Sequence, residues 1–240
     1  MRYTLEQHAV WRTLYRRRME SLRTTASRVF LDGAARIGIG ERGIPDLAEV
    51  NARLLPLTGW SAVPVAGFVP AAEFFASLAR KRFPTTVTIR QGDQLDYVPE
   101  PDIFHDVFGH VPLHADPRFA GFLERFGTTA AAATDADEVT RLARLFWFTV
   151  EFGLVREDGE VRLYGSGLIS SQADGTHALG PACERRPFDL DAVLEQPFVI
   201  DRLQDVLFVI DSFEQLFDAV GRLRRDHCSG CGYHPSPGVT

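Results

Sequence analysis

Apolar residues recur at spacings of three and four positions through most of this 240-residue chain, and this periodicity limits the fold more than any other feature. Strict alternation of apolar and polar residues, the pattern of a half-buried strand, is brief wherever it occurs. Helices should therefore dominate, and the strands are too few for a doubly wound parallel sheet. We predict a mainly α fold with a small β-sheet, in the α+β class.

Local patterns place the individual elements. The stretch "PAAEFFASLARKRF", residues 70–83, has a proline at a helix start and puts Phe74, Phe75 and Leu78 on one side of that helix. Other helices are expected, one or two at Leu5–Val29 and one each at Asp46–Leu55, Asp137–Val155 and Ser212–Arg225. Strands are expected at the β-branched "TTVTI" (85–89) and, less strongly marked, at "VRLYG" (161–165) and "PFVID" (197–201).

The length and the 45% share of apolar residues fit one domain with a sizeable core. We expect this domain to cover residues 1–225 and the glycine- and proline-rich residues 226–240 to form a flexible tail. Cys228 and Cys231 form a lone CxxC pair in that tail. With three cysteines in all, they are interpreted as incidental thiols, with a redox or zinc role as the alternative.

The charge of the chain argues against two classes of partner. A formal net charge of -6 is a poor match for a nucleic acid or an anionic membrane surface. The arginine clusters at residues 15–18, 79–83 and 221–226 are interpreted as solvated helix faces. The first residues are charged throughout, unlike a signal peptide, and no apolar run reaches the roughly 18–20 residues of a membrane helix. We expect a cytoplasmic protein.

The stretch "PDIFHDVFGH", residues 101–110, carries two histidines five positions apart. Asp102 lies where a helix N-cap is expected, and Pro112 limits the helix beyond His110. In a regular helix, five residues turn through about 500°, so His105 and His110 would point about 140° apart. Shared metal ligation would need a distorted helix. The spacing alone leaves metal ligands and ordinary capping or core histidines both open.

A third candidate ligand is Glu151, the single acidic residue in the apolar run "LFWFTVEFGLV" (145–155). A buried carboxylate needs a cation, hydrogen bonds or a metal, or else it stays protonated. An arginine salt bridge is the ordinary alternative. Two neutral imidazoles and one carboxylate on a redox-active iron would leave three neighbouring coordination positions free. Zinc more often takes a closed tetrahedron or keeps one open position.

Three motifs, "YVPEPDIFHDVFGHVPLHADPRFAGF", "LFWFTVEFGL" and "LYGSGLISS", occur in this order. Together they resemble the catalytic domain of the pterin-dependent aromatic amino acid hydroxylases, and they are most similar to the bacterial members that hydroxylate phenylalanine. The resemblance runs from about residue 5 to residue 220. It implies a single helical catalytic domain that uses Fe(2+), tetrahydrobiopterin or a related reduced pterin, and O2 to convert phenylalanine to tyrosine. His105, His110 and Glu151 would hold the iron.

The resemblance also implies substrate contacts. Arg90, in "TIRQG", would grip the substrate carboxylate, and Asp102 would steady Arg90 while capping the helix. The other residues expected around the substrate are Pro101 near His105, Trp147 beside the ring, Ser170 near the first histidine, and Ile200 in the pocket wall. Val98 departs from the vertebrate pattern, which has threonine there, so it offers no hydroxyl to the substrate.

Pterin contacts follow from the same motifs. Phe74 would stack on the heterocycle, and the backbone of "GFVPA" would bond its edge through Gly67, Phe68, Val69 and Ala71. Asp106 would reach the pterin directly or through water. It is shorter than the glutamate of vertebrate members.

Alternative functions remain at this point. Within the family, the alternative is hydroxylation of tryptophan, or of phenylalanine at another ring carbon, since pocket shape decides the substrate. Trp147 favours phenylalanine over the larger indole, and the uncharged Ile200 argues against tyrosine. A zinc hydrolase with Asp106 as general base is an alternative of another class, whereas a binding module leaves the convergent ligands without a purpose. The chain shows no regulatory domain and no long heptad helix, so we expect a monomer or weak dimer.

Overall fold

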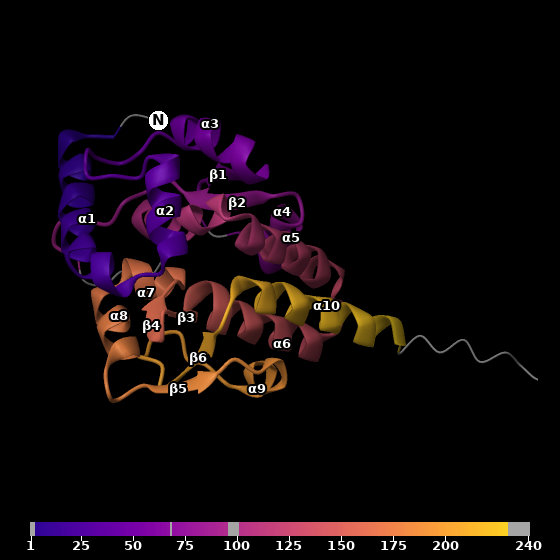
Figure 1. Ribbon diagram of the computed structural model, residues 1–240. Helices are drawn as coiled ribbons and strands as arrows, with labels where there is room; N and C mark the ends of the chain where they lie inside the picture. The colour runs from indigo at the N-terminus through magenta and orange to yellow at the C-terminus, as the bar shows by residue number, and fades with distance from the viewer. Residues whose placement is uncertain (1–2, 68, 96–100, 230–240) are drawn as a thin grey trace, which may run out of the picture.

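The computed structural model describes residues 3–67, 69–95 and 101–229, and helices form most of it (Figure 1). The first part of the chain contains α1 (Leu5–Thr25), α2 (Arg28–Ile37), α3 (Leu47–Thr58), β1 (Ser61–Val65), α4 (Ala71–Leu78), β2 (Arg82–Thr86), η1 (Phe104–His110), η2 (Val111–Ala115) and α5 (Pro117–Ala132). The second part contains α6 (Ala136–Phe146), η3 (Trp147–Glu151), β3 (Leu154–Glu157), β4 (Glu160–Leu163), α7 (Ser166–Ser170), α8 (Gln172–Leu179), β5 (Glu184–Pro187), α9 (Leu190–Glu195), β6 (Val206–Ile210) and α10 (Phe213–Ser229). The predicted α+β class is confirmed.

The strands form two small sheets within the described residues. β1 and β2 make a parallel pair, and the larger sheet has the order β4-β3-β6-β5. In that sheet β3 and β4 are antiparallel, whereas β6 runs parallel to both β3 and β5. Figure 1 shows α1 to α4 with the β1–β2 pair on one side of the molecule and the larger sheet with α8 and α9 on the other.

Two of the three predicted strands form. The predicted strand at 85–89 is shifted, since β2 covers Arg82–Thr86, and the prediction at 161–165 corresponds to β4. The prediction at 197–201 is wrong. Val199 and Ile200 are exposed, and the parallel neighbour of β3 forms later in the chain, as β6, whose last four residues are all buried. A buried sheet strand needs such a continuous apolar run.

The helix predicted at Asp137–Val155 forms as far as Glu151, as α6 followed by the π-helix η3, and the prediction is wrong only beyond that residue. From Leu154 the chain is the strand β3. Gly153 marks the turn between them, because a Cβ atom at this position would lie 2.1 Å from the Tyr164 ring and 2.3 Å from the Thr149 carbonyl oxygen. Only glycine, which has no Cβ atom, lets the chain at this position lie so close to the Tyr164 ring and the Thr149 carbonyl.

Helix boundaries at the two ends of the chain follow local signals. The predicted helical region at Leu5–Val29 divides into α1 and α2, because the Ser27 side chain accepts a hydrogen bond from the Phe30 N–H and starts a new helix. At the other end, α10 continues to Ser229, past the predicted boundary at residue 225. Residues 230–240, including Cys231, lie outside the described residues, so the flexible tail stays a prediction.

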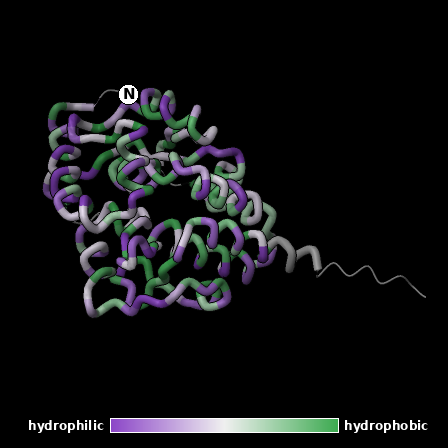
Figure 2. The backbone as a smooth tube through the Cα atoms, in the orientation of Figure 1, coloured by the Kyte–Doolittle hydropathy of each residue, from purple (hydrophilic) through white to green (hydrophobic). Residues whose placement is uncertain are grey.

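Aromatic packing anchors η1 in the core. Phe104 and Phe108 stack on each other with ring centroids 4.6 Å apart. Trp11 of α1 packs edge-on against Phe104, and Phe30 of α2 packs edge-on against Phe108. One side of η1 is therefore fixed against α1 and α2, and its histidines are left for the other side. Figure 2 shows hydrophobic stretches running through the interior and hydrophilic ones on outer helices such as α1.

A tight hairpin joins β3 to β4. Asp158 and Gly159 at its tip have φ values of 51° and 83°, the positive values that a two-residue type I′ turn requires. The register pairs Leu154 with Leu163 and Glu157 with Glu160. The hairpin thus returns the chain to the end of η3, where α7 begins. Within the described ranges, every helix is too short or too polar to cross a lipid bilayer.

Candidate active site

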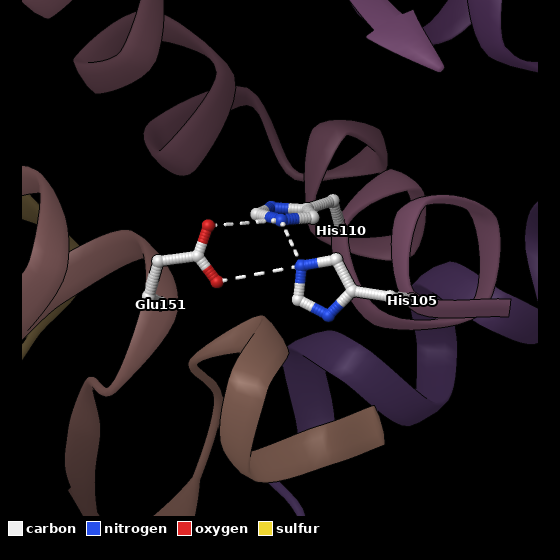
Figure 3. Close-up of side chains that lie close together, drawn as sticks. All are labelled: His105, His110 and Glu151. Atoms are coloured by element: carbon white, nitrogen blue, oxygen red, sulfur yellow. Dashed lines mark hydrogen bonds and ion pairs between the residues drawn. The ribbon is translucent and has the colours of Figure 1, made fainter. Parts of the chain in front are cut away.

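Three potential metal ligands from two π-helices meet at one point. His105 and His110 lie on η1, and Glu151 is the last residue of η3. The Nε2 atoms of the two imidazoles are 3.1 Å apart. The carboxylate oxygens of Glu151 lie 3.2 Å from His110 Nε2 and 3.5 Å from His105 Nε2. Figure 3 shows the three side chains pointing toward one another, with a different carboxylate oxygen facing each imidazole, so two nitrogens and one carboxylate form a donor triangle.

The type of helix explains how histidines five positions apart converge. η1 is π-helical from Phe104 to His110, and the N–H of Val111 bonds the carbonyl of Asp106, five residues earlier. With this i to i+5 bonding, side chains five positions apart come close to the same face. The predicted distortion therefore extends over the whole of η1. Gly109 contributes by close packing, since a Cβ atom there would lie 3.0 Å from the Ser166 carbonyl oxygen.

Glu151 is ionised although its neighbours are apolar. Burial alone would raise the pKa of its carboxyl group, but attraction and hydrogen bonding from His110, attraction from His105 and a hydrogen bond from Ser166 lower that pKa to about 2. The Ser166 hydroxyl donates to Glu151 Oε2 at 2.6 Å. The salt bridge to arginine, considered above as the alternative, does not form within the described residues, where the carboxylate of Glu151 faces the two imidazoles instead.

Hydrogen bonds select the histidine tautomer that a metal requires. Ser170 Oγ donates to the Ser166 carbonyl at 2.8 Å and lies 2.9 Å from His105 Nδ1, so it can accept the proton of that nitrogen. His105 Nε2 is then left with a free lone pair. His110 Nδ1 is buried and has no hydrogen-bond partner within the described residues.

The donor triangle fits a single transition-metal ion. Lone pairs on the two Nε2 atoms and a carboxylate repel one another at these separations unless a cation or proton lies between them. Two donors bound to one ion at about 2.1 Å are about 3.0 to 3.4 Å apart for right-angled to tetrahedral geometry. The two Nε2 atoms, 3.1 Å apart, lie in this range, and the carboxylate presents Oε1 to His110 at 3.2 Å and Oε2 to His105 at 3.5 Å. Two histidines and one carboxylate define the ligand class of mononuclear non-heme iron oxygenases.

Arg90 and Asp102 form a buried ion pair next to the histidines. Arg90 Nε and Nη2 donate to the two carboxylate oxygens of Asp102 at 2.8 and 2.9 Å, and the side chains are only 7% and 5% exposed. Burial would raise the pKa of Asp102, but the hydrogen bonds and charge of Arg90 lower it. Asp102 also accepts the His105 backbone N–H at 3.0 Å. Asp102 thus contacts both Arg90 and the first turn of η1, and its part in substrate binding stays a prediction.

A cavity of about 750 Å³ lies beside the triad. Its lining includes the two triad residues His105 and Glu151 and all the described residues predicted around the substrate except Asp102, namely Arg90, Pro101, Trp147, Ser170 and Ile200. Trp147 stacks between Phe152 and Phe198, with centroids 4.7 and 4.5 Å away. Metal ligands, an arginine and an aromatic wall thus share one cavity, an arrangement that suits a small aromatic molecule with a carboxylate.

The residues predicted to contact the pterin are not part of this lining. Asp106 is buried, which raises the pKa of its carboxyl group, and its Oδ2 accepts the Thr86 backbone N–H at 2.6 Å. Phe74 packs edge-on against Phe83 and Phe146. The other described members of the predicted set are Gly67, Val69 and Ala71. Phe68 and Val98 lie outside the described residues.

The sequence analysis did not identify two polar residues that lie near the site, Ser166 and Arg18. Ser166 contacts Glu151, as described above, but in the sequence it was only one letter of the motif "LYGSGLISS". Arg18, assigned to a solvated arginine cluster, is only 3% exposed, and this assignment is wrong. Its guanidinium donates to the carbonyls of Leu168 and Ile169 at 2.9 and 2.7 Å, so it caps the end of α7. Burial lowers the pKa of Arg18 to about 10.

Comparisons with known proteins agree with this site. The family model described as biopterin-dependent aromatic amino acid hydroxylase matches residues 1–226. Phenylalanine-4-hydroxylases from Ralstonia nicotianae and Chromobacterium violaceum are 45% and 43% identical over 220 residues, which cover 91% of this chain and 70% and 74% of the relatives. A structure of the Chromobacterium violaceum phenylalanine hydroxylase with bound iron(III) and 7,8-dihydrobiopterin has a TM-score of 0.89 at 40% identity, covering 100% of this chain and 88% of that one.

The chain therefore belongs to the biopterin-dependent aromatic amino acid hydroxylases. This result confirms the family predicted from the three sequence motifs. The bound iron(III) in the Chromobacterium violaceum structure agrees with the iron class inferred from the donor triangle.

Proposed function

We propose that this chain hydroxylates L-phenylalanine to L-tyrosine, using ferrous iron, a reduced pterin and O2. The observation that carries the proposal is the donor triangle of His105, His110 and Glu151 beside a cavity with an aromatic wall. The relatives named above are phenylalanine hydroxylases, and one of them binds iron and dihydrobiopterin in its structure.

His105, His110 and Glu151 would hold the iron. When bound, iron and reduced pterin activate O2, one oxygen atom of which enters the ring while the pterin takes the other and supplies two electrons. The part played by the chain is to fix the three ligand atoms and to keep bulk water away. Trp147 and Phe152 in the cavity lining would serve the second purpose once the substrate ring fills the cavity, because a reactive oxidant is protected when water is excluded.

Arg90 would bind the substrate carboxylate. A guanidinium has five N–H groups, and three of those of Arg90 bond Asp102 and the Leu95 carbonyl. Within the described residues this leaves two for a carboxylate, which accepts such paired donors well. The Asp102 contacts fix the guanidinium plane before substrate arrives, so little side-chain entropy is lost on binding.

The ring would lie against Trp147, between Arg90 and the metal ligands. Trp147 restricts the space, which favours phenylalanine over tryptophan, and Ile200 offers no charged partner to a phenol, which disfavours tyrosine. Pro101 and Ser170 complete the predicted substrate contacts. Val98 stays in this set as a prediction.

Pterin contacts are proposed for Asp106, Phe74 and the backbone of residues 67–71. Phe74 would stack on the heterocycle, and Asp106 would bond it directly or through water. Phe74 lies on α4 and Asp106 on η1. Phe74 packs edge-on against Phe83, whose ring in turn lies 4.7 Å from that of His110.

Product identification tests the proposal. Protein loaded with Fe(2+) is supplied with tetrahydrobiopterin, O2 and a mixture of phenylalanine, tyrosine and tryptophan, and the products are identified by mass spectrometry. Tyrosine formed from labelled phenylalanine is the expected product. H105A and E151A should give none while keeping a folded circular dichroism spectrum, and H8A, which changes a histidine remote from the cavity, should stay active.

Three outcomes would contradict the proposal. Hydroxylated tryptophan as the main product would show that tryptophan is the substrate. Phenylalanine hydroxylated at another ring carbon would show a different regiochemistry. Hydrolytic activity that needs zinc and no O2 would show that the protein is a hydrolase and not an oxygenase.

A cytoplasmic location and a monomeric or weakly dimeric state stay predictions from the sequence.

A further inference from the structure

The β3–β4 hairpin brings Ser166 opposite Glu151. Its register pairs Leu154 with Leu163. Glu151 lies three residues before the first of these and Ser166 three residues after the second, so continuing the register places them face to face. Backbone bonds extend the pairing toward them, since the N–H groups of Tyr164 and Gly165 both donate to the Gly153 carbonyl, at 3.2 and 2.9 Å.

Ser166 is fully buried where it meets Glu151. It is 0% exposed, and its hydroxyl donates to Glu151 Oε2 at 2.6 Å. Gly165 and Gly167, on either side of Ser166, both lie close against the backbone of Glu151. A Cβ atom at Gly165 would lie 2.5 Å from the Glu151 carbonyl oxygen, and one at Gly167 would lie 3.1 Å from the same atom. The hydroxyl therefore has a close and enclosed contact with one oxygen of a metal ligand.

The helix that carries Ser166 is itself fixed in position. Arg18 donates to the carbonyls of Leu168 and Ile169 near the end of α7. Ser170, one turn after Ser166, lies against His105 Nδ1 at 2.9 Å and donates to the Ser166 carbonyl. One short helix thus contacts ligands from both π-helices, His105 through Ser170 and Glu151 through Ser166.

We propose that Ser166 is a positioning residue for the metal centre, whose hydroxyl holds Oε2 of Glu151 so that the carboxylate keeps one orientation toward His105 and His110. This inference rests on the proposed function, because it assumes that Glu151 is a metal ligand. Hydrogen bonds to ligating side chains orient them, and their loss typically lowers metal affinity by about 10- to 100-fold. If Ser166 merely filled space, its loss would lower the stability of the metal-free protein and leave metal affinity unchanged.

The test measures Co(2+) binding to the metal-free, full-length protein by calorimetry and visible absorption. We compare wild type with S166A and S166G, both of which remove the hydroxyl. H105A, which removes a ligand, is the reference for a broken site. S27A is the matched control, because Ser27 is also 0% exposed and its hydroxyl only caps α2. Thermal unfolding of each metal-free protein is recorded in parallel.

We expect S166A and S166G to bind Co(2+) about 10- to 100-fold more weakly than wild type and to change its visible spectrum. S27A should unfold at a lower temperature but keep wild-type affinity. Wild-type affinity in S166A and S166G would overturn the positioning role while leaving the proposed function intact. Failure of wild type itself to bind Co(2+) would overturn both, so the two failures are distinguishable.

Discussion

The two sides of the metal triad differ in how far they are prepared for a ligand. On the cavity side, Arg90 is held by Asp102, and Trp147 is stacked between two phenylalanines. On the side of β2, Asp106 is bonded to Thr86, and Phe74 packs against other phenylalanine rings. The side chains on the cavity side line an open cavity. On the β2 side, the polar and aromatic side chains already contact other residues of the protein.

If phenylalanine and the pterin bind at the sites proposed above, this difference predicts different degrees of preorganisation for the two ligands. A rigid, open cavity loses little entropy when an amino acid binds. A pterin on the other side would have to exchange contacts that the protein already makes, or rely on the backbone near Gly67 and Ala71, which are both exposed. Variants on each side should therefore affect different ligands and by different amounts.

The largest effect is expected from D102A on the cavity side. Removing one partner of a buried ion pair leaves the Arg90 charge uncompensated, which typically costs about 3–5 kcal/mol of unfolding free energy. Urea denaturation measures the change. The control is E184A, which breaks the exposed pair of Glu184 and Arg186 and should leave stability nearly unchanged. A small effect of D102A, equal to that of E184A, would contradict the structural importance of the pair.

R90K tests substrate recognition on the same side. Lysine keeps the charge but cannot present paired N–H groups to two carboxylates at once. Loss of a charge-assisted hydrogen bond of about 1.5–3 kcal/mol should lower kcat/KM for phenylalanine by roughly 10- to 100-fold, mainly through KM. Steady-state kinetics at saturating pterin measure this. An unchanged KM for phenylalanine, or a raised KM for the pterin alone, would assign Arg90 to the other ligand.

On the β2 side, the burial of His114 leads us to expect that the free energy of unfolding depends on pH. It packs against Trp60 and Phe83, and burial lowers its pKa from 6.5 to about 3. Between these values the unfolded chain binds a proton that the folded protein does not. Stability should therefore fall as pH decreases from about 6.5 toward 3, by up to about 1.4 kcal/mol per pH unit.

Urea denaturation of the metal-free protein at several pH values measures this slope. H114N removes the titrating group and should flatten the slope, although the variant will be less stable at neutral pH because it leaves a gap among aromatic rings. The same slope in wild type and H114N would show that other groups account for the acid sensitivity.

The smallest effect is expected from D106N. The variant keeps an oxygen that can accept from Thr86 but removes the charge proposed to attract the pterin. Loss of about 0.5–1.5 kcal/mol should raise KM for tetrahydrobiopterin roughly two- to tenfold and leave KM for phenylalanine unchanged. Equal increases in both KM values would indicate that Asp106 supports the metal site as a whole instead of one ligand.

The sequence was sufficient to predict the fold class and the donor set. Glu151 was recognisable because a lone carboxylate in an apolar run needs a partner, and the family motifs then joined it to His105 and His110. The π-helical register of η1 was not predictable, because spacing rules assume regular α-helices and tertiary packing determines such departures.

Other features of the structure could not be predicted from the sequence, for different physical reasons. The apolar stretch at 197–201 resembles a strand, but Ile200 is 76% exposed at the cavity and the chain pairs later, at β6. Ser166 is ordinary in its local sequence and gains importance only from the hairpin that returns it to Glu151. The Asp158-Gly159 pair was a usable signal for that hairpin, since this dipeptide favours the type I′ turn.

The hairpin also limits which changes of length this part of the chain can accept. Adding one residue to β3 alone would slip the pairing by one position and turn every following side chain to the opposite face. Insertions and deletions in the two strands must therefore occur in matched pairs, or be confined to the tip at Asp158 and Gly159, which is exposed. A foreign peptide grafted at that tip would leave the spacing between Glu151 and Ser166 untouched, so the tip is the natural place for a tag or reporter.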